Sequence, residues 1–205
     1  MFQWTAGNFN IIGVTCGGVL LKGMPMQKSL PVSILLSLGL SVLSFAADAP
    51  KTFPVGEFTF GRPASWEWVP TTSAMRKAEL KVESKDKKEK AEVIFFHFGE
   101  SNGGGTQANV DRWLGQFKEP REKLNSKVDA AKINGRAVTF VQAEGTYMSG
   151  MPGGAKTPQP NAMLLGAIVE SAKGNVFVRM TGPVALVKEA QGDFKKMIES
   201  AAKGG

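Results

Sequence analysis

One histidine and a small group of methionines are the residues of this 205-residue chain whose types could support chemistry. A single histidine, with no cysteine beyond the N-terminal segment, excludes Cys–His catalysis and zinc sites built from several histidines. His97 alternates with Val93 and Phe95 in an apolar segment, which favours a histidine held within or at the end of a β-sheet. The alternative is a polar group in a pocket beside a glycine-rich loop, which would make the protein an envelope hydrolase with a cleft near His97.

Methionines suggest a second chemistry. Met148 and Met151 form an M-x-x-M pair, and Met163 follows the same segment. Thioethers bind Cu(I), so this pair together with His97 could form a weak copper site. Copper sites usually gather more soft ligands than this, and methionines also fill gaps in hydrophobic cores. We therefore expect neither a metal nor a cofactor.

A glycine-rich stretch at residues 99–105 partly matches a phosphate-binding loop. Gly99 and Gly104 occupy the first two glycine positions of G-x-x-x-x-G-K-[ST], and Thr106 occupies the hydroxyl position. Gly105 stands where the phosphate-contacting lysine is required. The stretch is therefore interpreted as a flexible connection between a strand and a helix.

The elements on either side of this connection should form the centre of the domain. An almost unbroken apolar run at 93–98 predicts a strand covered on both faces. Beyond the glycines, Thr106 offers an N-cap hydroxyl. The apolar residues that follow recur at helical spacing and predict one buried stripe, formed by Val110, Trp113, Leu114 and Phe117.

Alternating apolar residues and turn signals predict the other elements. Trp66 and Trp68 stand two apart, so both indoles point the same way in a strand, and we expect them in the core rather than on an exposed aromatic platform. Asn134-Gly135 predicts a tight hairpin. Glycines and prolines predict a long loop at 148–161. The expected strands are 57–60, 66–68, 78–83, 128–133, 136–147, 162–170 and 176–181, and a closing helix begins at Pro183.

The N-terminal segment predicts export. From Met26 onward, Lys28 supplies a positive start, residues 30–45 are apolar, and Ser44-Phe45-Ala46 is a signal-peptidase site. We expect an upstream extension plus secretory signal peptide at 1–46, a mature N-terminal segment at 47–56 that leads into the domain, and a single α+β domain at 57–202. The mature protein would be periplasmic or secreted, without a stable membrane span and, because Cys16 is the only cysteine, without a thiol.

The charge distribution argues against nucleic-acid binding. The formal net charge is +7, but basic and acidic residues are interspersed. Even the densest run, at 85–90, mixes both signs between two expected strands, which is typical of a solvated hairpin loop. We therefore expect no nucleic-acid partner.

The order of elements resembles the PsbP/Mog1-like fold. The likeness is carried by Phe58-Thr59-Phe60 leading into Pro63-Ala64-Ser65-Trp66, the Asn134–Ala137 turn, Val176-Phe177-Val178 before Thr181-Gly182, and the last helix around Phe194–Ser200. The resemblance implies a mainly antiparallel β-sheet flanked by helices on both faces, an α/β/α sandwich. The family includes photosystem II extrinsic subunits, their bacterial relatives and small-GTPase-binding proteins, so it also implies a non-catalytic accessory or binding module.

The expected function is therefore that of an exported soluble module that binds an unknown protein or a small ligand in the cell envelope. Binding residues are often carried on loops over a rigid sheet, and the loops at 70–77 and 148–161 are the irregular ones here. If both lie at one end of the sheet beside His97, they would frame a shallow recognition surface. The candidate surface consists of Arg76, Lys77, His97, Tyr147, Met148 and Met151.

Overall fold

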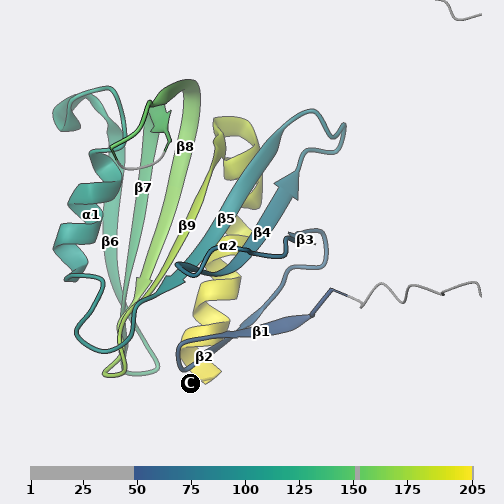
Figure 1. The fold of residues 1–205 in the computed structure, drawn as a ribbon, viewed down its shortest axis with the longest axis vertical. Coiled ribbons are helices and arrows are strands. Elements are labelled where there is room, and N and C mark those ends of the chain that lie inside the picture. The colour runs from purple at the N-terminus through teal and green to yellow at the C-terminus, as the bar shows by residue number, and fades with distance from the viewer. Residues whose placement is uncertain (1–48, 151–152, 205) are drawn as a thin grey trace, which may run out of the picture. The chain divides into compact units, whose positions relative to one another are not determined.

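A seven-stranded antiparallel sheet with a helix on each face forms the domain (Figure 1). The computed structural model describes residues 49–150 and 153–204, so the expected signal peptide and Met151 lie outside the described residues. The strand order is β3-β4-β5-β9-β8-β7-β6, and β1 and β2 form a separate two-stranded sheet. The expected α+β class is confirmed. The strands are β1 Thr52–Val55, β2 Phe58–Gly61, β3 Glu67–Trp68, β4 Arg76–Glu83, β5 Lys90–His97, β6 Asn125–Ile133, β7 Arg136–Ser149, β8 Thr157–Val169 and β9 Val176–Pro183; the helices are α1 Thr106–Leu114, the short 3₁₀ helix η1 Arg121–Lys123 and α2 Val184–Gly204.

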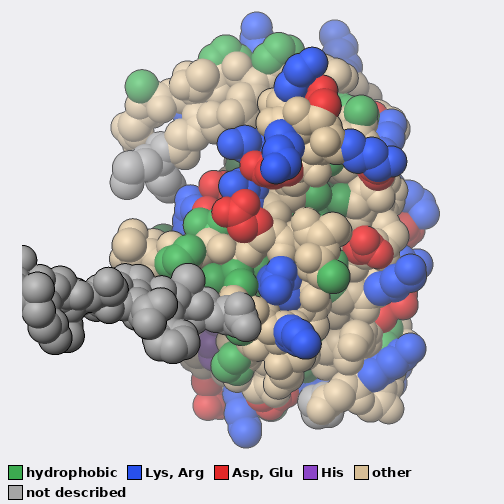
Figure 2. Space-filling model, turned by 90° about the vertical axis from the view of Figure 1, so that its right-hand side faces the viewer, with side chains coloured by type: hydrophobic (Ala, Val, Ile, Leu, Met, Phe, Trp, Pro, Cys, Tyr) green, Lys and Arg blue, Asp and Glu red, His purple; other side chains and the backbone are tan. Residues whose placement is uncertain are grey.

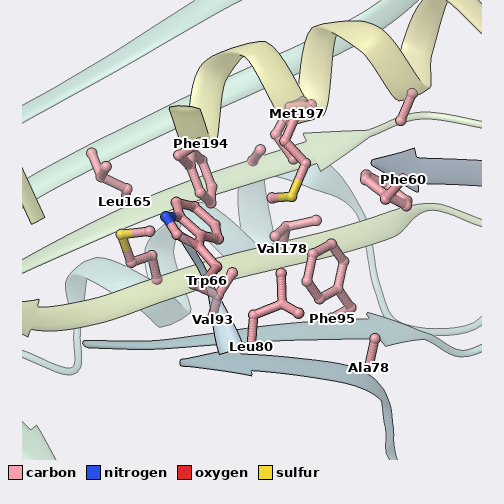
Figure 3. Close-up of a cluster of buried hydrophobic side chains, with 14 of the residues drawn as sticks. Phe60, Trp66, Ala78, Leu80, Val93, Phe95, Leu165, Val178, Phe194 and Met197 are labelled. Atoms are coloured by element: carbon pink, nitrogen blue, oxygen red, sulfur yellow. The ribbon is translucent and has the colours of Figure 1, made fainter. Parts of the chain in front are cut away.

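The larger core lies between the sheet and α2. The apolar stripe predicted for the last helix is buried against strands β4, β5, β8 and β9. Figure 3 shows Trp66 reaching into this core near Phe194 and Leu165. Trp66 is only 2% exposed and Trp68 is half-buried against the same core, so the core interpretation of this pair is confirmed.

The smaller core lies on the opposite face, under α1. Val110, Trp113, Leu114 and Phe117 are buried there, as the helical spacing predicted. Gly166 of β8 makes room for the indole, because a Cβ at this position would overlap the Trp113 ring. The predicted N-cap is wrong: α1 begins at Thr106 with Gly105 as the cap, and the Thr106 hydroxyl donates to Glu170 Oε1 over 2.6 Å.

Two segments differ from the expected elements. Residues 52–55 form β1 although Pro54 interrupts their pattern, and Phe53 and Val55 are buried. The expected loop at 148–161 is mostly a hairpin, because β7 runs to Ser149 and β8 starts at Thr157. Strand β9 reaches only as far as Ala162, so the prolines of β8 at 158 and 160 lie where one edge of the strand is free and a missing N–H costs little.

Helix α1 covers only part of its face of the sheet. Its core involves strands β7, β8 and β9, and the only β5 residue that packs against it is the half-buried Phe96. Phe98, just past β5, is 38% exposed, so the far end of the apolar run is not covered on both faces as expected. The candidate site lies over β4, β5 and β9, on the half of this face that α1 does not cover. In the described residues, no helix is long and apolar enough to cross a bilayer.

Candidate functional site

A hollow with a volume of about 1060 Å³ lies over the half of the sheet that α1 leaves open. We call it the groove. The β7–β8 hairpin forms one wall, and strands β4, β5 and β9 form the floor. Seen from the β3–β4 side, basic and acidic side chains alternate on this part of the molecule (Figure 2). The groove is lined by Glu67, Val69, Arg76, Glu79, Lys81, Lys90, Ala91, Glu92, Tyr147, Ser149, Gly150, Pro158, Gln159, Pro160, Ala162, Arg179, Thr181, Gly182 and Pro183.

The alternation of β4 explains the charge of the groove floor. Ala78, Leu80 and Val82 are buried in the α2 core, so the intervening residues Glu79 and Lys81 point to the other face. The register of β4 against β5 shifts between Arg76 and Ala78. This bulge turns Arg76 to the same face as Glu79, which a regular strand would not do at a spacing of three.

Three of the four basic residues in the groove are paired with carboxylates. Arg76 Nη1 lies 2.7 Å from Glu79 Oε2 and 3.6 Å from Glu92 Oε1. Lys81 Nζ lies 2.7 Å from Glu67 Oε2, and this hydrogen bond is the main reason that the pKa of Lys81 is raised. Lys90 Nζ lies 3.6 Å from Glu83 Oε1, just outside the groove lining. These charges therefore compensate one another.

Arg179 on β9 is the exception. Within the described residues, its guanidinium has no carboxylate within 4.0 Å. Nη1 donates to Gln116 Oε1 over 3.0 Å, the guanidinium carbon lies 5.9 Å from the centre of the Phe96 ring, and the buried Nε has no hydrogen-bond partner. A half-buried cation with an unsatisfied donor is expensive, so an anion in the groove would be stabilising here.

Tyr147 completes the polar centre of the groove. The segment after α1 runs beside β7, with the Met148 amide donating to the Gln116 carbonyl and the Lys118 amide to the Thr146 carbonyl. This pairing places the Tyr147 hydroxyl 3.0 Å from Gln116 Oε1, which therefore accepts from both Tyr147 and Arg179. Burial raises the pKa of the Tyr147 phenol, Arg179 opposes the shift and Glu92 adds to it. The phenol is consequently a neutral donor at physiological pH.

Of the sequence-predicted site residues that the structure describes, two are brought together. Arg76 and Tyr147 both line the groove. Lys77 is exposed outside the groove lining, and Met148 is half-buried outside it.

The expected common surface beside His97 is wrong. Arg76 pairs in register with Phe96, next to His97, whereas the β7–β8 hairpin extends past the other end of β9. His97 follows Val93 and Phe95, whose side chains face the α2 core, so it is also on the other face of the sheet. The two loops therefore lie at opposite ends, and the groove joins their residues across the sheet face.

The environment of His97 matches a structural histidine. It is the last residue of β5, its Nε2 lies 3.2 Å from the carbonyl oxygen of Lys173, and its ring packs against the turn at Gly56. The hydrolase alternative required a carboxylate in contact with His97. In the described part of the chain no carboxylate oxygen lies within 4.0 Å of a ring nitrogen of His97. The described residues also hold no group of three His, Cys, Asp or Glu side chains arranged as metal ligands, and Met163 is buried in the α2 core.

Sequence reasoning missed Arg179 and Gln116. A signal for the first was present, because Arg179 is the one charged residue in the otherwise apolar run from Val176 to Met180. A lone cation in such a run needs a special environment. No signal was present for Gln116, because its position depends on how the chain returns from α1 to β7.

Comparison with known proteins finds likeness of fold only. No family model matches the chain, and no curated protein sequence matches it. Solved structures with a similar fold include cyanobacterial PsbP (CyanoP) from Synechocystis, with 9% identity over 78% of this chain and 96% of that one and a TM-score of 0.45. LpqN, involved in cell envelope biogenesis of Mycobacterium tuberculosis, matches with 11% identity over 70% of this chain and 80% of that one and a TM-score of 0.43.

PA94, a protein from Pseudomonas aeruginosa, matches with 13% identity over 72% of this chain and 92% of that one, and a TM-score of 0.36. A PsbP protein, from the family that the sequence resembles, is thus among the solved structures that match. The functional argument therefore rests on the groove.

Proposed function

We propose that this chain is an exported, non-catalytic accessory module that binds a partner bearing a carboxylate group through the groove. The partner is an acidic protein segment or a small carboxylate ligand of the cell envelope. The Arg179 guanidinium receives the carboxylate, while the Tyr147 hydroxyl and the Gln116 amide fix the orientation of Arg179.

The proposal rests on how the basic residues of the groove are paired with carboxylates. Among the described residues, the other basic residues of the lining have carboxylate partners within 3.6 Å, whereas Arg179 contacts a neutral amide and an aromatic ring. Guanidinium groups bind carboxylates through paired N–H donors, and burial strengthens such a contact. A ligand carboxylate would supply the missing counter-charge.

The types of side chain at the polar centre of the groove also favour binding over catalysis. The polar centre consists of an arginine, an amide and a phenol that is neutral at physiological pH. The arginine and the phenol donate hydrogen bonds and the amide oxygen accepts them, and none of the three groups is poised as a nucleophile or a general base. The export part of the proposal rests on the signal-peptide pattern at 26–46.

Photo-crosslinking in the exporting cell tests the proposal. A photoreactive phenylalanine derivative replaces Ser149 in the groove wall, and in a matched protein it replaces Asp193 on the exposed side of α2. Intact-mass analysis after irradiation detects adducts with proteins and adducts with small molecules. We expect an adduct at position 149 and none at position 193.

Two arginine substitutions make the test specific. Arg179→Gln should abolish the adduct at position 149, whereas Arg112→Gln, at an exposed arginine of α1 outside the groove, should leave it unchanged. An adduct that survives Arg179→Gln, or equal adducts at both positions, would overturn the proposal. Irradiation without any adduct at position 149 would do so too.

A further inference from the structure

Strand β6 is the exposed edge of the seven-stranded sheet. It spans nine residues, Asn125–Ile133, and in the described residues it pairs only with β7. Eight of the nine are exposed, and Ile133 is partly buried. Alternate residues of such a strand present N–H and C=O groups to the open side, which makes the edge a template for another strand.

The side chains of β6 carry a self-complementary pattern around Val128. Lys127 and Asp129 lie on one face of the strand, with Nζ and Oδ2 2.7 Å apart and side chains that are 69% and 54% exposed. Val128 points to the other face and is 45% exposed. The Lys–Val–Asp sequence is therefore accessible from the open edge.

We propose that β6 pairs with β6 of a second copy of this chain, antiparallel and with the two-fold axis at Val128. In this register Lys127 lies opposite the partner's Asp129, and Asp129 lies opposite the partner's Lys127. Val128 meets the partner's Val128 on the other face of the sheet. Residues 125–131 of each copy are paired.

Charge selects this register over its neighbours. Residues directly opposite each other in an antiparallel pair point to the same face of the sheet. In a symmetric dimer with a continuous sheet, the two-fold axis therefore passes beside a residue, and the next possible registers have the axis one residue earlier or later. An axis at Lys127 places two lysines opposite each other, and an axis at Asp129 places two aspartates opposite each other. Like charges directly opposite are destabilising, whereas the Val128 axis creates two opposite-charge pairs and no like pair.

The dimer would leave the groove open. Strand β6 lies at one edge of the sheet and β3 at the other, with the groove over β4, β5 and β9. The two copies would join their sheets into one continuous sheet with two grooves. Because seven paired residues a side form a small interface, the dimer should be weak and concentration-dependent.

Sedimentation analysis with a charge swap tests the proposal. The protein is purified in the form that accumulates in the exporting cell and is studied from micromolar to millimolar concentration. We expect a monomer–dimer equilibrium in the unchanged protein. Lys127→Asp alone and Asp129→Lys alone each create two like-charge pairs and should weaken dimerisation about tenfold or more.

The double variant Lys127→Asp with Asp129→Lys restores both opposite-charge pairs in the same register. Its dimerisation should return to within about threefold of the unchanged protein, a difference below 1 kcal/mol. A protein that stays monomeric at every concentration would overturn the proposal. Dimers that tolerate either single change, or that the double change does not restore, would also overturn it; unchanged melting temperatures show that each variant is folded.

Discussion

Trp113 and Gly166 show how one small residue fixes the position of a helix. The indole of Trp113 is 4% exposed and occupies the space above Gly166 of β8, where a Cβ would overlap the ring. The Trp113→Ala change should lower the free energy of unfolding by about 3–5 kcal/mol, because it leaves a cavity under α1. Gly166→Ala should cost about 1–3 kcal/mol through overpacking.

A double-mutant cycle by chemical denaturation checks that the two residues act through one contact. In the Trp113→Ala background the ring is gone, so Gly166→Ala should cost far less than in the unchanged protein. An equal cost of Gly166→Ala in both backgrounds would show that the indole does not lie over this strand.

At the scale of the elements, Glu57 links the β1–β2 turn to the β8–β9 turn and to the start of β7 by hydrogen bonds. It follows β1, and its Oε1 accepts hydrogen bonds from Ser171 between β8 and β9 and from Arg136 at the start of β7, each over 2.8 Å. The Ser171 hydroxyl is the largest of the causes that hold the pKa of this carboxyl below its usual value, and Arg136 adds to it. The ionised form therefore stabilises the fold above the unfolded pKa of about 4.3, and this contribution is lost as the pH falls through the folded pKa.

Glu57→Gln should consequently flatten the acid side of the stability profile. At neutral pH the variant should be less stable than the unchanged protein, and the difference should shrink as the pH falls below the unfolded pKa of a glutamate and through the lowered folded pKa of Glu57. Thermal unfolding measured across this range checks it, with the exposed Glu122→Gln as the control that changes little. A difference that stays constant with pH would mean that the charge of Glu57 contributes nothing.

The elements also show what a sequence can and cannot predict. The core strands, the stripe of α2 and the Asn134-Gly135 turn follow from alternation, helical spacing and turn chemistry; both turn residues have positive φ, 49° and 83°. Strand β1 and the β7–β8 hairpin were missed because their prolines signal loops, although prolines are tolerated where an edge is free. The groove was missed because it depends on how much of the sheet α1 covers, which is decided by tertiary packing.

At the scale of the whole molecule, export should determine which chain is present in the cell. The signal-peptide pattern predicts cleavage after Ala46, so the accumulated form should begin at Ala47. Intact-mass measurement of the protein from the exporting cell checks this directly. A mass that includes Cys16 would contradict the expected processing.

The central claim is that the groove recognises a carboxylate through Arg179, and an NMR titration tests it most directly. The side-chain Nε resonances of the arginines are followed while tetraglutamate is added, with tetraglutamine as the uncharged control at the same ionic strength. We expect tetraglutamate to shift the Arg179 resonance saturably and tetraglutamine to leave it unchanged, while Arg112 on α1 responds to neither. Equal responses to both peptides, or a response of the exposed arginine with none at Arg179, would contradict the account.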